Sequence, residues 1–153
     1  MEEVVFCPTV DYEVLEGEKG WPPLAPATPG SSGIDLRTME RVCIPNLGRT
    51  TVGTGVRLMI PKGFDCTIRP RSSMTIRGVI IPVGTVDADY RGELRVVLFN
   101  MSGHDFYLEP GDRIAQMVFT QLVRPTITVA SREVFEVAKT YRGVNGFGST
   151  GIA

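Results

Sequence analysis

The sequence predicts an all-β protein, a sandwich or barrel of short and mostly antiparallel strands. Short segments rich in β-branched and aromatic residues recur at near-regular spacing, and glycine, proline and polar residues separate them. No segment keeps a helical period, and only residues 72–78 have room for one or two helical turns. With 153 residues, of which 42% are apolar, the chain has the size and composition of one folded domain.

The predicted elements begin with a strand built on Val4, Phe6 and Val10. Residues 17–30 are too rich in proline and glycine for a helix or a central strand, so we expect a loop there. Alternation of apolar and polar residues, or a short run rich in apolar residues, predicts the strands that follow. These are residues 33–37, 42–44, 51–60, 64–68, 79–86, 94–98, 106–108, 114–119 and 126–129.

Charge and composition exclude several classes of partner. The net charge of −1 gives no basic field for nucleic acid, and no apolar run is long enough to span a bilayer. The first residues lack the basic start and apolar core of a signal peptide. The three cysteines have neither metal-ligand nor paired spacing. We therefore expect a soluble intracellular protein (cytoplasm or nucleus) without nucleic-acid or membrane partners.

A polar corner joins the strands at residues 79–86 and 94–98, which we expect to form a hairpin. It holds Asp87 and Asp89 beside Tyr90. Aspartate and glycine favour turns for backbone reasons alone. The corner by itself is therefore compatible either with ordinary turn chemistry or with a site.

Two further stretches carry more polar detail than a sandwich needs. In Arg71-Ser72-Ser73, a planar fork of donors and two hydroxyls follow an apolar strand, a combination that suits an anion. A structural alternative is a salt bridge of Arg71, with Ser72 as the N-cap of a short helix. Gln116 lies inside an otherwise apolar strand, where a buried amide needs partners.

The last polar stretch is the glycine-rich tail at residues 142–151. So much backbone freedom indicates a mobile segment unless something orders it. Phe147 has no packing role in such a segment, but it can stack on a planar ligand while neighbouring groups hold phosphates. A terminus without a function is the alternative.

In five ordered motifs the chain resembles the trimeric all-β deoxyuridine triphosphate nucleotidohydrolases (dUTPases). The motifs are residues 30–36, 70–74, 84–92, 111–116 and 142–151. The chain departs from the family pattern at Ile34, at Ser73 and at Met74-Thr75, and its proline-rich loop is long. None of these departures removes a polar group with an assigned role.

The resemblance implies a distorted jelly-roll or β-sandwich barrel that hydrolyses dUTP to dUMP and pyrophosphate. This reaction keeps uracil out of DNA and supplies dUMP for dTTP synthesis. Water would attack the α-phosphorus, with Asp87 as general base, Gln116 fixing the water and Ser72 near the bridging oxygen. Mg²⁺ would be held by the phosphates and by water, with Asp35 and Gln116 as candidates for contact with that water. Asp35 can instead pair with Arg113.

The resemblance also implies how the substrate is bound. Phosphates would be held by Arg71, Ser72, Ser73 and Arg142, and the uracil edge would be read by Gly84, Thr85, Val86 and Arg95. Tyr90 would lie under the deoxyribose, Phe147 would stack over the uracil, and Gly148 and Ser149 of the tail would help to hold the phosphates. Asp89 is expected only to fix the turn.

The family is a homotrimer with sites between subunits. We therefore expect residues 1–140 to form the β-barrel domain and residues 141–153 a flexible lid over a neighbour's site. Two alternatives stay open: a dCTP deaminase or bifunctional relative on the same fold, with Glu93 as its only candidate acid, and a catalytically silent relative that binds proteins.

Overall fold

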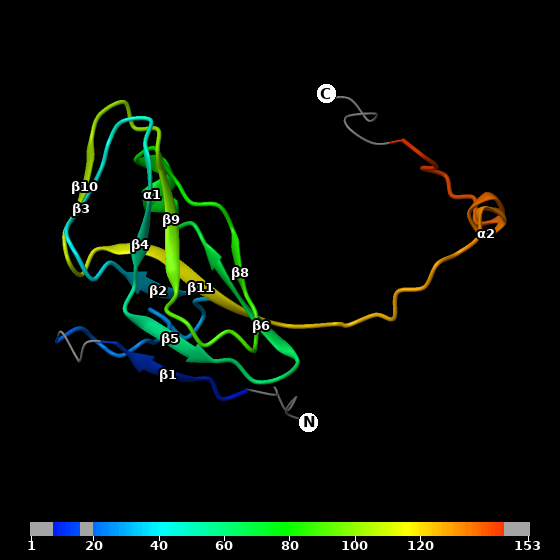
Figure 1. Ribbon diagram of the computed structural model, residues 1–153, viewed down its shortest axis with the longest axis horizontal. Coiled ribbons are helices and arrows are strands. Elements are labelled where there is room, and N and C mark those ends of the chain that lie inside the picture. Colours follow the sequence, from blue (N-terminus) through cyan, green and yellow to red (C-terminus); the bar gives the residue numbers. More distant parts are fainter. Residues whose placement is uncertain (1–7, 16–19, 146–153) are drawn as a thin grey trace. The chain divides into compact units, whose positions relative to one another are not determined.

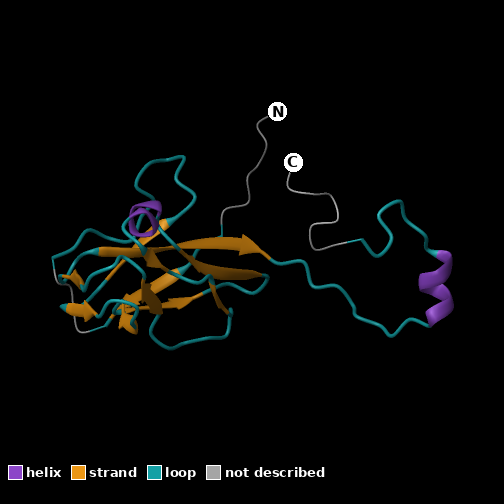
Figure 2. Cartoon of the chain, turned by 90° about the horizontal axis from the view of Figure 1, so that it is seen from above, coloured by secondary structure: helices purple, strands orange, loops and turns teal. Residues whose placement is uncertain are grey.

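The computed structural model describes residues 8–15 and 20–145 of the chain, in two compact units (Figure 1). The first unit is Met1–Val123 and the second is Arg124–Ala153. The first unit contains the strands and one short helix (Figure 2). In the part of the chain that the structure describes, no helix is both long and apolar enough to cross a membrane.

The all-β prediction is confirmed, and every strand pair in the described residues is antiparallel. The strands form four small sheets: β2-β11-β6-β8, β4-β9-β7, β1-β5 and β3-β10. The described strands do not close into one barrel, as expected of a distorted jelly-roll. The elements of the first unit are β1 (Asp11–Val14), β2 (Ile34–Arg37), β3 (Val42–Ile44), β4 (Arg49–Gly53), β5 (Val56–Met59), β6 (Phe64–Arg69), α1 (Ser72–Ile76), β7 (Val79–Ile80), β8 (Gly84–Val86), β9 (Arg95–Asn100), β10 (Phe106–Leu108) and β11 (Arg113–Gln121).

One core lies between these sheets, and alternation along the strands supplies it. On β9 the residues Val96 and Leu98 are buried while Arg95 and Val97 are exposed. The same period of two fills the core from the other strands. Asn100 is one of three buried polar residues in the described structure, with Thr38 and Thr54, and its amide donates to the Ile44 carbonyl at 2.8 Å, so burial leaves it satisfied.

The predicted single strand at residues 51–60 is wrong, because the chain turns a corner within it. Gly55 has a φ of 67°, a conformation that glycine adopts without steric cost. The Thr54 hydroxyl donates to the Leu94 carbonyl at 2.8 Å and fixes the corner to the start of β9. The two halves, β4 and β5, therefore join different sheets.

The predicted strand at residues 79–86 is also two strands, since Pro82 lacks an N–H for a ladder. At the base of the expected hairpin, β7 pairs with β9, with Val79 opposite Asn100. Farther along, β8 leaves β9 and pairs with β6 instead. The hairpin is therefore closed at its base and open toward the polar corner. There β8 is the edge strand of its sheet.

The N-terminal strand begins later than predicted. Val4 and Phe6 lie outside the described residues, and Val10 precedes the strand, which starts at Asp11. Pairing with β5, in which Asp11 lies opposite Met59, determines where it starts. The proline-rich loop that follows is irregular as expected, apart from one bridge between Pro26 and Ile34.

In the second unit, two predictions about secondary structure are wrong. Residues 126–129 form no strand, because no described segment pairs with them. At most one short helix was predicted, yet a second, α2 (Arg132–Val137), follows. Arg132 Nε lies 2.8 Å from Glu136 Oε1, one turn away, and the Ser131 side chain lowers the pKa of Glu133 by hydrogen bonding.

Candidate active site

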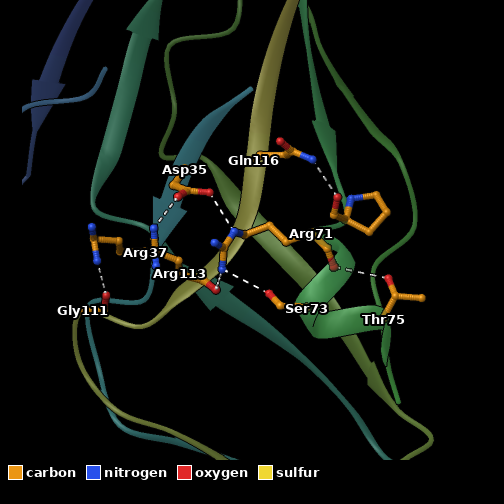
Figure 3. A network of polar contacts seen from close by, with 9 residues as sticks. Asp35, Arg37, Arg71, Ser73, Thr75, Gly111, Arg113 and Gln116 are labelled. Atoms are coloured by element: carbon orange, nitrogen blue, oxygen red, sulfur yellow. Dashed lines mark hydrogen bonds and ion pairs between the residues drawn. The ribbon is translucent and has the colours of Figure 1, made fainter. Parts of the chain in front are cut away.

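A carboxylate on β2 lies between two arginines that come from other elements of the first unit (Figure 3). Asp35 Oδ1 lies 2.7 Å from Arg71 Nε, and Asp35 Oδ2 lies 3.3 Å from Arg113 Nη1. The pairing with Arg113 was one of the two alternatives in the sequence, whereas the pairing with Arg71 was not foreseen. The side chains of Asp35 and Arg71 are only 25% and 21% exposed, so water screens this pair less than a surface pair.

The register of β11 explains why these side chains meet. This strand lies between β2 and β6, and it places Gln116 opposite Asp35 on one side and Arg69 on the other. The pairing with β2 shifts between Arg113 and Ala115. Such a bulge changes the direction of the neighbouring side chains, here that of Arg113.

Gln116 is half-buried and has one firm partner. Its Nε2 donates to the Pro70 carbonyl at 3.0 Å (Figure 3). Because that bond takes up the amide nitrogen, Oε1 is left as the acceptor and lies over Gly33. A Cβ at residue 33 would lie only 2.1 Å from Oε1, so the position of this amide requires glycine there.

The segment from Arg71 to Ser73 combines an engaged guanidinium with one hydroxyl, that of Ser72, that has no partner among the described residues. Arg71 Nη1 donates to the Arg113 carbonyl at 3.0 Å and lies 3.4 Å from Ser73 Oγ. Its Nη2 makes no hydrogen bond to any described residue. The structural alternative is right about the Arg71 salt bridge but wrong about the cap: α1 is capped by Arg71 without a side-chain bond, and the exposed Ser72 hydroxyl has no partner among the described residues.

The corner between β8 and β9 is a turn whose carboxylates take no part in it. The Tyr90 N–H donates to the Asp87 carbonyl at 3.1 Å. Arg91 Nη1 donates to the carbonyls of Ala88 and Tyr90 at 2.7 and 2.9 Å. In the described structure neither the Asp87 nor the Asp89 carboxylate makes a hydrogen bond or ion pair. The expectation that Asp89 fixes the turn is therefore wrong, because the Arg91 side chain braces it instead.

Glu93 and Arg95 continue this corner into β9. Glu93 Oε1 accepts the Gly55 N–H at 2.8 Å, and Glu93 Oε2 lies 3.5 Å from Arg95 Nη1. Arg95 Nη2 also donates weakly to the Thr51 carbonyl at 3.4 Å. The sequence did not single out Glu93 as a support of the corner. The feature of the sequence that could have indicated this role is the position of Glu93, directly after Gly92 of the motif.

The remaining predicted site residues are distributed over separate parts of the chain. Gly84, Thr85 and Val86 form β8. In the second unit, Arg142 Nε donates to the Asn145 carbonyl at 3.0 Å. Phe147, Gly148 and Ser149 lie outside the described residues.

Among the described residues of one chain, the elements bring together only part of the predicted site. Asp35, Arg71, Ser73, Arg113 and Gln116 form one connected network. No hydrogen bond or ion pair among the described residues links Asp87 or Tyr90 to it. Within the described residues of one chain, the hairpin corner thus has no polar contact with the arginine-serine cluster, by which we mean Asp35, Arg71, Ser73, Arg113 and Gln116.

A cavity of about 400 Å³ adjoins the cluster under the proline-rich loop. Asp35, Arg37 and Arg113 line its charged part. Arg37 Nη1 donates to the Gly111 carbonyl at 2.7 Å and so braces the turn before β11. Sequence reasoning left the role of the loop open; in the structure, Leu24 packs against the core and residues 21–27 form one wall of this cavity.

The described residues contain no cluster of three or more histidine, cysteine, aspartate or glutamate side chains that could hold a metal ion. Asp35 is the only carboxylate in the arginine-serine cluster, and two guanidiniums already contact it. This donor set does not fit direct coordination of a metal by protein side chains. It fits an ion held mainly by substrate phosphates and water.

The fold and this cluster define a small all-β protein in which two arginines flank one partly buried carboxylate. The family model described as dUTPase matches residues 19–151. The chain is 42% identical to the deoxyuridine 5'-triphosphate nucleotidohydrolase of Brucella melitensis biotype 2, over 96% of each chain. It is 41% identical to that of Paramecium bursaria Chlorella virus 1, over 80% of this chain and 85% of the relative. The chain therefore belongs to the dUTPase family.

Solved structures agree on the fold. The dUTPase of Staphylococcus bacteriophage 80alpha with dUpNHpp matches 95% of this chain and 100% of its own, with a TM-score of 0.82 and 22% identity. A dUTPase from phage phi11 of S. aureus, in which a structural Mg(II) ion is coordinated, matches 82% of this chain and 98% of its own. Its TM-score is 0.73 and its identity 18%.

Proposed function

We propose that this protein hydrolyses dUTP to dUMP and pyrophosphate at a site that several chains complete. Membership of the dUTPase family supports the reaction. The observation that supports this site is that some of its polar groups have partners and others have none. Asp35, Arg113 and Gln116 are tied to one another or to the backbone, whereas the Asp87 carboxylate and the Ser72 hydroxyl have no partner among the described residues.

Asp87 is the general base in this proposal. It takes a proton from a water molecule whose oxygen attacks the α-phosphorus, while the bond from that phosphorus to the departing pyrophosphate oxygen breaks. A carboxylate that is exposed and not held in a salt bridge is free to accept a proton, and general-base catalysis contributes about 10² to 10⁴ in rate. Gln116 accepts a hydrogen bond from that water through Oε1, because its Nε2 is taken by the Pro70 carbonyl.

Arg71, Ser72 and Ser73 bind the phosphates. The guanidinium is already oriented by Asp35, and its free Nη2 supplies a charged donor without a large loss of rotamer freedom. Ser72 donates to the bridging oxygen, where charge develops as pyrophosphate leaves. Arg142 is assigned to the γ-phosphate.

The open hairpin recognises uracil and deoxyribose. As the edge strand of its sheet, β8 has a row of backbone donors and acceptors that no described strand uses, and a planar base edge can pair with such a row. Arg95 at the start of β9 is assigned to the uracil edge together with β8, and Tyr90 lies under the sugar. Phe147 stacks on the base, with Gly148 and Ser149 beside it.

Magnesium acts with the substrate. In this proposal Asp35 and Gln116 would hydrogen-bond the water around an ion that the phosphates hold. When bound, the ion neutralises phosphate charge.

The assembly is a homotrimer, in which the hairpin corner of one chain meets the arginine-serine cluster of another. An exposed apolar face of the β4-β9-β7 sheet supports association. Val97 and Ile80 on this face are 37% and 49% exposed, and Met101 just after β9 is 57% exposed. We assign residues 141–153 to a lid over a neighbour's site and residues 1–140 to the barrel domain.

The deaminase alternative requires a free acid, and Glu93 does not supply one. Its two carboxylate oxygens are occupied by the Gly55 N–H and by Arg95. The experiment that separates the alternatives follows both products with Mg²⁺ present. Pyrophosphate from dUTP without ammonia from dCTP supports the proposal. Ammonia from dCTP supports a deaminase or bifunctional enzyme, and no turnover of either supports a silent relative.

A further inference from the structure

The Tyr90 ring lies directly against the backbone of Gly92. A Cβ built on Gly92 would lie 2.3 Å from the Tyr90 hydroxyl oxygen, 2.5 Å from Cζ and 3.0 Å from Cε2. Two of these distances are well inside the closest approach of non-bonded atoms. The ring therefore occupies the space that any side chain at residue 92 would need.

Gly92 is not required by its own backbone conformation. The described residues with a positive φ include seven glycines, and Gly92 is not among them. An alanine can adopt the same φ and ψ without the strain that left-handed positions impose. What residue 92 must supply is space for the Tyr90 ring.

The tyrosine is held at both ends. Its N–H donates to the Asp87 carbonyl at 3.1 Å, and its hydroxyl donates to the Glu93 carbonyl at 3.0 Å. These two bonds hold the Tyr90 side chain against the residues that follow it in the same turn. They also place the ring in the same turn as Asp87.

The carbonyl that receives the hydroxyl is itself fixed to the core. The Leu94 N–H, which belongs to the same peptide group, donates to the Val56 carbonyl at 2.7 Å. The Glu93 carboxylate accepts the Gly55 N–H, and the Thr54 side chain, in a residue only 2% exposed, donates to the Leu94 carbonyl. Through these contacts the buried corner between β4 and β5 determines where the Tyr90 hydroxyl can lie.

We propose that Gly92 is a positioning residue that sets the sugar specificity of the enzyme by giving the Tyr90 ring its place. The inference rests on the proposed function, in which that ring lies under the deoxyribose. A ring pressed against the Gly92 backbone and tied to the Glu93 carbonyl cannot retreat to admit a 2′-hydroxyl. A displaced ring can, so a side chain at residue 92 relaxes the choice between dUTP and UTP.

The test is the ratio of kcat/KM for dUTP to kcat/KM for UTP in Gly92→Ala. We expect this ratio to fall by about tenfold or more, since a displacement of about 1 Å costs up to about 10² in a positioned site. Tyr90→Phe adds no atom and removes only the hydroxyl bond, so it should lower the ratio in the same direction by a smaller factor. Tyr107→Phe removes an exposed hydroxyl elsewhere and should leave the ratio unchanged.

A double variant separates positioning from general damage. In a Tyr90→Ala background the ring is absent, so adding Gly92→Ala should not change the ratio further. The inference is overturned if the ratio of kcat/KM for dUTP to that for UTP is unchanged in both Gly92→Ala and Tyr90→Phe. It is also overturned if Gly92→Ala lowers this ratio equally in the wild-type and in the Tyr90→Ala background. If Gly92→Ala does not fold, the dUTP to UTP ratio of Tyr90→Phe alone tests the inference.

The ratio of dissociation constants for dUpNHpp and its ribonucleotide counterpart provides a second readout. Because tighter binding means a smaller dissociation constant, this ratio is low in the wild type and should rise in Gly92→Ala by a similar factor. Failure of the wild type to hydrolyse dUTP would overturn the proposed function. The binding ratio would still decide whether Gly92 sets the sugar preference.

Discussion

At the residue scale, the two aspartates of the hairpin corner are proposed to differ in role, although their contacts do not distinguish them. Both carboxylates are without partners in the described structure, so their own chain does not distinguish them. The assignment of Asp87 as the base comes from its place in the family motif. It requires a test that compares the two directly.

Asp87→Asn should lower kcat for dUTP by about 10² to 10⁴, because the amide cannot accept the proton of the attacking water. Binding of dUpNHpp should be retained, since the side chain remains similar in size. Asp89→Asn is the matched control and should turn over near the wild-type rate. Near-normal turnover of Asp87→Asn would remove Asp87 from the base role.

Gly33→Ala tests whether the Gln116 amide is catalytic. The added Cβ would lie 2.1 Å from Gln116 Oε1, so the amide must move away from the water that it is proposed to hold. We expect kcat to fall by up to about 10² with a smaller change in KM. Gly30→Ala, whose Cβ would meet nothing within 4 Å, is the control. Equal activity of the two variants would show that the position of Gln116 does not limit turnover.

The two cysteines of the described structure should differ in reactivity. Burial and the neighbouring Asp65 carboxylate raise the pKa of the Cys66 thiol from 9.0 to about 11, whereas Cys43 is exposed. In a Cys7→Ser background, native protein at pH 8 should therefore react with a thiol reagent at Cys43 and not at Cys66. Rapid labelling of Cys66 in folded protein would contradict this.

The raised pKa of the Cys66 thiol also predicts how the free energy of unfolding depends on pH. Above about pH 9 the unfolded chain loses the Cys66 proton while the folded protein keeps it. This contribution to the free energy of unfolding is complete below pH 9 and is lost as the pH rises toward about 11. Denaturant titrations of wild type and Cys66→Ala across that range measure it, because the variant lacks this part of the pH dependence.

At the element scale, the sequence predicted which segments are strands better than it predicted where they break and pair. Alternation identified the core faces of β6 and β9 because one face of each strand is buried, whereas β11 was recognised as a continuous apolar run. Two breaks fall at a glycine and a proline that the sequence shows, Gly55 and Pro82. Which sheet each half then joins is set by distant segments, and no local pattern contains that information. The predicted strand at residues 126–129 failed for a related reason: a strand needs a partner as well as the right composition.

The arginine-serine cluster shows the same limit. Asp35, Arg71 and Arg113 are far apart in the sequence, and only the register of β11 between β2 and β6 brings them together. Composition indicated an anion site at Arg71. The ion pair with Asp35 that orients the Arg71 guanidinium could not be foreseen. The steric roles of Gly33 and Gly92 could not be foreseen either, since a glycine gives no sign of which side chain occupies the space beside it.

At the scale of the whole molecule, the tail should matter for turnover and not for assembly. Deleting residues 142–153 removes Arg142 and Phe147, and we expect kcat/KM for dUTP to fall by about 10² or more through loss of phosphate and base contacts. Size measurements should still give a trimer. A monomer would instead mean that the tail holds the assembly together.

The central claim is that each site takes its phosphate-binding arginine and its base from different chains. Two inactive variants, Arg71→Ala and Asp87→Asn, test it when they are unfolded together in equal amounts and refolded. If Arg71 and Asp87 reach a site from different chains, random mixed trimers regain about a quarter of the wild-type dUTP turnover, because one site in four receives both intact side chains. If both residues act within one chain, every site keeps one defect, and the mixture stays as inactive as its parts.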